Sequence, residues 1–171
     1  MSVIVKSSGE DATRIETVTT NGIIFNSVNS NGYPTDVTIR TNVIINGAFY
    51  LDNSESASDN FLSKVVNLEV IANTIHDIAF KNTFREISTV GKFKIKAKSI
   101  GEDSFYGIAS TSKVVTKIWI SKVCETMDYR AFYNTTADIY CEASSKPSGW
   151  NTTWTNVTPT FGVSEAEFDA L

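Results

Sequence analysis

One short pattern recurs along the middle of this chain and constrains its fold more than any other feature. The pattern is clearest in Ser99–Phe105 (SIGEDSF), where a small residue precedes a phenylalanine and an apolar residue stands four positions before the small one. Looser copies end at Ala48-Phe49, Ala79-Phe80 and Ala131-Phe132. A motif that recurs at intervals of about 20 to 50 residues is typical of stacked structural repeats.

An alternating pair of apolar residues lies upstream of each copy. The pairs are Val37/Ile39, Leu68/Val70, Phe93/Ile95 and Ile118/Ile120. Alternation with a period of two predicts short strands whose apolar side chains face one side. A single strand with its return segment cannot bury that side alone, so neighbouring units must stack and share a core. We therefore predict a mainly β fold, a short solenoid of about four degenerate repeats.

We expect one compact domain with four consecutive parts, because a chain of 171 residues is of single-domain size. Residues 1–32 form an N-terminal β cap, in which Asn21-Gly22 is typical of a hairpin turn. Residues 33–142 form the repeats. Residues 143–163 form a C-terminal cap, with Trp150 and Trp154 covering the last core layer. In the tail, residues 164–171, Ser164 and Glu167 have the spacing of a helix capping box.

The repeats resemble the bacterial BspA-like leucine-rich repeats, whose unit reads roughly I-x-I-P-x-S-V-x-x-I-G-x-x-A-F. Ile118–Phe132 (IWISKVCETMDYRAF) matches the length of this unit, and Ser99–Phe105 matches its second half best. Ile139–Trp150 is similar to the element that ends such arrays, whereas the strand proline of the family is missing from every unit. The resemblance covers about two thirds of the chain. It implies a right-handed leucine-rich-repeat solenoid with little helix, and a binding role.

Composition argues against nucleic-acid and membrane partners. The net charge of -4 gives no overall attraction to nucleic acid. No apolar run is long enough for a bilayer span or a signal peptide, so we expect no membrane insertion. Two cysteines, Cys124 and Cys141, are too few for a disulfide framework or a zinc site. We expect buried thiols at both positions and leave their disulfide state open.

No combination of residues indicates catalysis. His76 is the only histidine, and no serine lies in the G-x-S-x-G context of a nucleophile. The acidic stretches Glu102-Asp103 and Asp52–Asp59 lack the spacing of a calcium loop, and there is no glycine-rich phosphate loop. We therefore expect no enzyme activity, no catalytic residues, no metal and no cofactor.

Basic residues gather on the outward side of the predicted strands. When the inward pairs are aligned, the central outward row reads Thr38, Glu69, Lys94, Trp119 and Tyr140. Lys92, Lys94 and Lys96 alternate along one strand, and Lys117 lies beside them on the next. This face could bind an anionic partner, such as an acidic protein surface or a charged glycan. The alternative is a solvated face in which Glu69 pairs with Lys94 across the sheet.

Two aromatic residues, Trp119 and Tyr140, adjoin these lysines in the central row. Exposed rings beside charged donors are typical of sugar sites and of protein-binding hot spots. Alternatively, cap residues such as Trp150 or Trp154 cover the two rings, which then belong to the core. The sequence leaves both alternatives open.

The pattern favours a non-catalytic protein-interaction or structural module. We expect a phage or prophage virion component, such as a capsid decoration, fibre or baseplate accessory, that binds a neighbouring subunit or a host surface. Its partners are then protein subunits, in a homo-oligomer or a hetero-assembly, and we expect Phe168 and Leu171 of the tail to dock on one of them. The alternative is an adhesin at the bacterial surface or secreted, which binds glycan or protein through Lys94, Trp119 and Tyr140.

Overall fold

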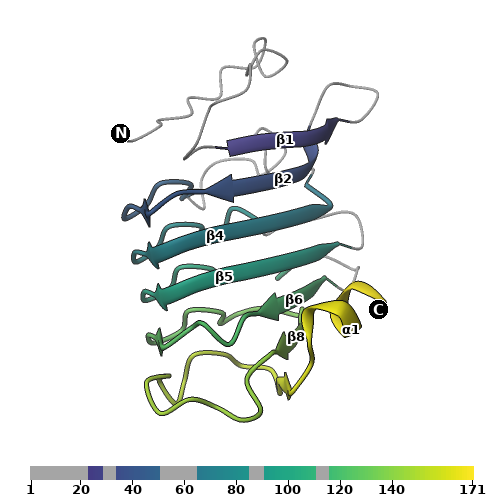
Figure 1. The fold of residues 1–171 in the computed structure, drawn as a ribbon. Helices are drawn as coiled ribbons and strands as arrows, with labels where there is room; N and C mark the ends of the chain where they lie inside the picture. Colours follow the sequence, from purple (N-terminus) through teal and green to yellow (C-terminus); the bar gives the residue numbers. More distant parts are fainter. Residues whose placement is uncertain (1–22, 29–33, 51–64, 85–90, 111–115) are drawn as a thin grey trace.

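The computed structural model describes residues 23–28, 34–50, 65–84, 91–110 and 116–171, and its fold is mainly β (Figure 1). One sheet, which is not closed, contains every strand of these described residues. In chain order the elements are β1 (Ile23–Val28), β2 (Pro34–Arg40), β3 (Val43–Ile44), β4 (Asn67–Ile75), β5 (Lys92–Ile100), β6 (Lys117–Ile120), β7 (Thr126–Met127), β8 (Asp138–Cys141), β9 (Thr160–Phe161) and the helix α1 (Glu165–Asp169).

The sheet is a ladder of parallel strands in chain order. Its path runs β1-β2-β4-β5-β6-β8-β9, while β3 pairs with β4 and β7 pairs with β5. Every pairing is parallel except β1 with β2, which is antiparallel. In Figure 1 the strands lie one below another, and their return segments lie behind them. Residues far apart in the sequence therefore lie side by side at matching positions of neighbouring strands.

The predicted inward phase and register of the strands are confirmed. All eight residues of the four alternating pairs are buried, with at most 2% of their surface exposed. Thr38, Glu69, Lys94, Trp119 and Tyr140 lie opposite one another on successive strands, as the alignment of the inward pairs predicts. Burial of one face fixes the register, since a slip of one residue would turn every apolar side chain outward.

The phenylalanines that end each copy of the pattern form a stack behind the sheet. The rings of Phe49 and Phe80 are 4.8 Å apart, those of Phe80 and Phe105 are 4.9 Å apart, and those of Phe105 and Phe132 are 4.8 Å apart, all nearly parallel. Trp154 ends the stack with an edge contact to Phe132 at 6.0 Å. Backbone hydrogen bonds join the same neighbouring return segments, for example from Phe105 N to Ala131 O at 2.8 Å. Each return segment is thus tied to the next by both rings and backbone.

A left-handed backbone conformation precedes each of these rings by two residues. Gly47, Ile78, Asp103 and Arg130 have φ between 51° and 64°. Three of these four are not glycine, so the surrounding stack must hold them in a conformation that such residues rarely adopt. Gly101 has a different role, because a Cβ on it would lie 2.4 Å from Asp77 Oδ1. The residue with the left-handed conformation in this turn is thus Asp103, whereas Gly101 allows two return segments to approach closely.

The two ends of the sheet differ. At the start, β1 adds an antiparallel strand to β2, while the predicted Asn21-Gly22 turn and the rest of residues 1–22 lie outside the described residues. At the other end, Trp150 and Trp154 are each 3% exposed and pack edge to face at 5.1 Å. Both tryptophans therefore belong to the buried core, while the role of residues 143–163 as a cap stays a prediction.

We expect Phe105→Ala to lower the free energy of unfolding by about 3–5 kcal/mol, because the deletion removes a fully buried ring between two stacked neighbours. Urea denaturation followed by circular dichroism measures this loss. Val123→Ala is the control, since that side chain is 48% exposed and its loss should change stability by less than about 0.5 kcal/mol. Equal effects of the two substitutions would contradict the role of the stack.

Candidate functional site

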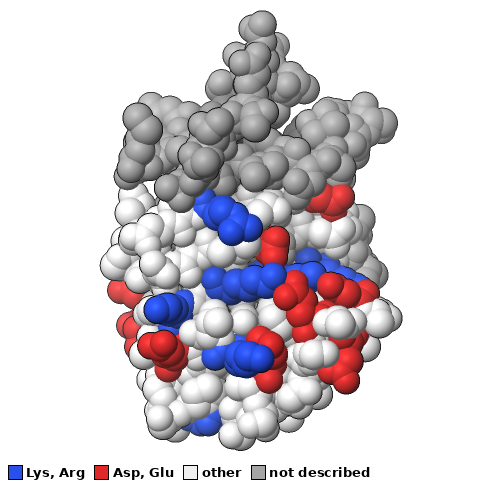
Figure 2. Space-filling model, in the orientation of Figure 1, with Lys and Arg blue, Asp and Glu red and all other residues white. Residues whose placement is uncertain are grey.

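The lysines predicted to face outward lie together on the sheet. Lys92, Lys94 and Lys96 project from β5 and Lys117 from the neighbouring β6, and we call these four residues the lysine face. Their neighbours in the strands, such as Phe93 and Ile95, are fully buried on the other side. Figure 2 shows the lysines as a blue band across the molecule with acidic side chains directly beside it. The concentration of basic charge inferred from the sequence is therefore present.

The chain's own C-terminal helix, α1, lies against the lysine face. Ser164 caps this helix: its Oγ accepts a hydrogen bond from Glu167 N, and its own N donates to Glu167 Oε2 at 2.8 Å. The predicted capping box is thus confirmed. In Figure 1, α1 (yellow) lies beside β6 and β8. A helix of five residues is not stable alone in water, so contacts with the sheet must hold it.

Charge complementarity orients α1 on the sheet. Lys94 Nζ is 2.7 Å from Asp169 Oδ1 and 3.1 Å from Glu165 Oε1. Lys96 Nζ is 2.8 Å from Glu165 Oε1 and 2.8 Å from Glu69 Oε1. Glu69 therefore pairs with Lys96, whereas the sequence alternative paired it with Lys94. Two carboxylates of α1 and one of the sheet together neutralise the centre of the lysine face.

The other two lysines bind backbone carbonyls at the last residue of α1 and just beyond it. Lys92 Nζ donates to Asp169 O, and Lys117 Nζ donates to Leu171 O at 2.9 Å. The last carbonyls of a helix lack partners within it and carry partial negative charge. All four members of the lysine face thus contact the C-terminal segment.

An aromatic contact lies next to the ion pairs. Phe168 of α1 is fully buried, with its ring 6.5 Å from that of Trp119 and 5.7 Å from that of Tyr140. Lys92 Nζ lies 5.9 Å from the centre of the Phe168 ring. Trp119 Nε1 donates to Val163 O at 2.8 Å, so the indole also binds the chain leading into the helix. The three rings form the apolar part of the site.

Of the two alternatives that the sequence leaves open for Trp119, the structure shows the covered ring, because only 1% of its surface is accessible. The covering residue is Phe168, whereas the sequence alternative assigned this cover to Trp150 or Trp154. Tyr140 is half-buried. The two residues expected to dock on a partner differ in exposure. Phe168 is buried within its own chain, while Leu171 is 51% exposed.

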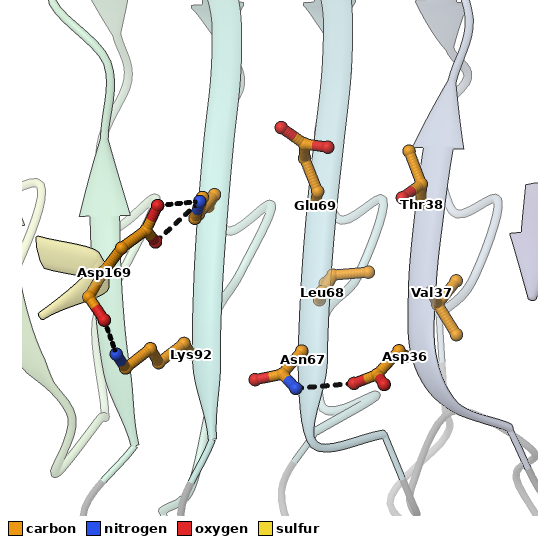
Figure 3. Close-up of a pocket in the computed structure, with 9 residues that line it drawn as sticks. Asp36, Val37, Thr38, Asn67, Leu68, Glu69, Lys92 and Asp169 are labelled. Atoms are coloured by element: carbon orange, nitrogen blue, oxygen red, sulfur yellow. Dashed lines mark hydrogen bonds and ion pairs between the residues drawn. The ribbon is translucent and has the colours of Figure 1, made fainter. Parts of the chain in front are cut away.

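A pocket of about 280 Å³ lies on the outer face beside the end of α1 (Figure 3). Asp169 and Lys92 lie on one side of it, and residues of β4 and β2 lie on the other. On the far side Asn67 Nδ2 donates to Asp36 Oδ1. Seven of its nine lining residues are polar or charged, with both charge signs present, so the pocket continues the lysine face past the helix. The residues that line it are Asp36, Val37, Thr38, Asn67, Leu68, Glu69, Lys92, Lys94 and Asp169.

Other reactive groups do not assemble into a second site within the part of the chain that the structure describes. Cys124 and Cys141 are buried free thiols, and burial raises the pKa of each to about 12. His76 is exposed in the turn after β4. Over the described ranges, no group of three or more histidine, cysteine or acidic residues could hold a metal ion. No helix among these residues is long and apolar enough to cross a bilayer.

Sequence reasoning missed Glu165 and Asp169 as members of this site. A signal was present, because the last eight residues contain three acidic groups and one aromatic ring, which complements a row of lysines beside two aromatic rings. Matching the two segments requires knowing that the chain returns from the end of the sheet to β5, and strand periodicity carries no such information.

No protein-family model, curated protein or solved structure matches this chain.

We expect Phe168→Ala to release α1 and expose Trp119, because the ring is the only fully buried side chain of the helix. The loss of stability should be about 2 kcal/mol, with a red shift of tryptophan emission. Leu171→Ala is the control on the same segment, since its side chain is 51% exposed and contributes little. An unchanged emission spectrum in Phe168→Ala would contradict the cover over Trp119.

The docking of α1 should also depend on pH. The hydrogen bond from Lys96, followed by that from Lys94, holds the pKa of Glu165 below its ordinary value. Burial alone would lower the pKa of Lys94, but its hydrogen bonds to Asp169 and Glu165 outweigh burial and raise it; the pKa of Lys96 is likewise raised, by bonds to Glu165 and Glu69. The ionised Glu165 carboxylate gives its full stabilisation of the docked helix above the ordinary glutamate pKa of about 4.3. This stabilisation is lost as pH falls through the lowered pKa.

The stabilisation of the docked helix by the charged lysines depends on pH in the opposite direction. It is complete below the ordinary lysine pKa of about 10.4 and is lost as pH rises through the raised values. We therefore expect α1 to remain docked between about pH 4.3 and pH 10.4, with release beginning only as pH falls through the lowered pKa of Glu165 or rises through the raised pKa values of Lys94 and Lys96. Tryptophan emission against pH measures the release. In Glu165→Gln the acid limb should become shallower, and an identical acid limb would contradict the assignment.

Proposed function

We propose that this protein is a non-catalytic interaction module, a structural component of a larger assembly such as a phage or prophage virion. The observation that carries the proposal is the outer face of the sheet, which binds a folded peptide segment through ion pairs, carbonyl contacts and one buried ring. A surface that holds a helix in this way has the features of a protein-recognition site. The partner class is therefore protein.

The architecture supports the same proposal. Parallel strands in register and stacked rings make a rigid support on which the outward residues keep fixed spacing. We propose that the whole is a short solenoid of the BspA-like leucine-rich-repeat type, with β8, β9 and the tryptophans as its closing cap. In such a fold the constant residues build the core, and the variable outward residues select the partner.

Partner chemistry follows from what the lysine face holds. An acidic segment with one aromatic residue satisfies both the ammonium groups and the rings of Trp119 and Tyr140. The adhesin alternative loses its main support, since a sugar would need the face of Trp119, which is covered, and its N–H, which binds Val163 O. Protein binding is thus the function we retain.

Particles purified on a density gradient from cells that carry the gene test this proposal. We expect the chain to co-sediment with the particles in a constant ratio, and a lysine-reactive cross-linker to join it to a neighbouring subunit. Particles from cells in which the gene is disrupted are the control for unspecific cross-links. If intact particles form without the chain, and the chain remains alone in the free fraction, the proposal is wrong.

A further inference from the structure

We propose that a second copy of this chain binds at the lysine face by exchange of the C-terminal segment, residues 164–171, so that each protomer donates α1 to the other. This inference rests on the proposed function, because it names the partner of the same surface. In the described structure each chain occupies its own site, and the dimer repeats the same contacts between chains. Such an exchange is a reciprocal, two-fold association.

The first argument is that the site and its occupant depend on each other. Without α1, Lys94 and Lys96 have neither Glu165 nor Asp169 beside them, and Phe168 no longer covers Trp119. Without the sheet, a helix of five residues is not stable. The site is therefore incomplete until an acidic segment with an aromatic residue occupies it, and a second copy carries that segment by definition.

The second argument concerns how the segment is attached. Gly162 and Val163 are tied to the body by backbone hydrogen bonds to Ala143 O and Cys141 O. From Ser164 onward, the backbone hydrogen bonds described for the segment stay within it, such as Phe168 N to Ser164 O at 3.0 Å. Every described bond between the segment and the sheet involves a side chain. The segment can therefore leave the sheet without breaking the strand ladder.

The third argument concerns the connection at this point. Gly162 has φ of 78°, and a Cβ placed on it would meet no atom within 4 Å. The backbone there is open to solvent, and a change of direction immediately after Val163 leaves the hydrogen bonds of Gly162 and Val163 to the body intact. Because α1 lies on the outer face of the sheet (Figure 1), two protomers that face each other through this surface can exchange helices over a short connection. The ion pairs and ring packing that break within each chain form again between the two chains, so the dimer keeps all of them.

Charge reversal tests this exchange. One variant carries Lys94→Glu and Lys96→Glu, and a second carries Glu165→Lys and Asp169→Lys. Each variant alone places like charges between helix and sheet and should remain a monomer with α1 released. In a mixture, the acidic helix of the first fits the basic sheet of the second, and the basic helix of the second fits the acidic sheet of the first. We expect a one-to-one dimer, with twice the chain mass of 18.8 kDa, by light scattering after size exclusion.

The control pair combines the second variant with Arg40→Glu/Lys98→Glu, which changes the charge equally at two exposed residues of β2 and β5. This control mixture should show no reciprocal dimer. Circular dichroism on each variant confirms that the sheet is intact. If folded charge-reversal variants do not associate on mixing, or if the control mixture associates as well, the exchange is wrong.

A second measurement uses the unaltered protein, which avoids any effect of substitution on folding. Light and heavy-isotope chains are mixed at high concentration and treated with a carbodiimide, which joins a lysine directly to a paired carboxylate. Peptide pairs joining Lys94 to Asp169 or Lys96 to Glu165 should include mixed-isotope pairs. Same-isotope pairs alone would show that α1 binds only within its own chain and would overturn the exchange. The particle experiment reads the proposed function separately, since the chain can belong to an assembly without exchanging its helix.

Discussion

The parallel register of the strands is the constraint on which the rest of this structure depends. Each inward residue of β4, β5 and β6 packs beside its counterpart on the next strand, and the phenylalanines of the return segments stack at 4.8–4.9 Å behind them. A shift by one residue would expose the core along the whole strand. The same register places Lys94 next to Trp119, and Trp119 next to Tyr140. The arrangement of the lysine face and its two aromatic rings is thus a consequence of core packing.

On that surface, burial of the Phe168 ring contributes more to holding α1 than any single ion pair does. A partly exposed ion pair contributes about 0–1 kcal/mol, and the carboxylates of Glu165 and Asp169 keep 38% and 50% of their side-chain surface exposed. Burial of a phenylalanine contributes about 1.5–3 kcal/mol. Phe168 is therefore the largest single contribution to the attachment, while the lysines decide which segment fits and in which direction. This division of roles is common at protein-binding surfaces.

Much of the fold was predictable because its elements have local signatures. Strand alternation identified the inward residues, the small residue–phenylalanine pairs identified the ring stack, and Ser164 with Glu167 identified the start of the helix. Other features have no local signature. Left-handed conformations at Ile78, Asp103 and Arg130 are imposed by the stack on residues that do not favour them. The sequence could not choose between an exposed and a covered Trp119, because alternation assigns a side of the sheet and cannot say what covers it.

The sequence by itself determined which residues face the core and which face outward, because periodicity and apolar burial operate within a few residues. It also determined that the chain carries basic and acidic segments with aromatic residues beside them. Only the tertiary structure decided that these two segments meet. The contact between Asp169 and Lys94 joins residues that are 75 positions apart in the sequence. It depends on where the chain leaves the last strand of the sheet. That position follows from the stacking of all the preceding strands and has no local sequence pattern.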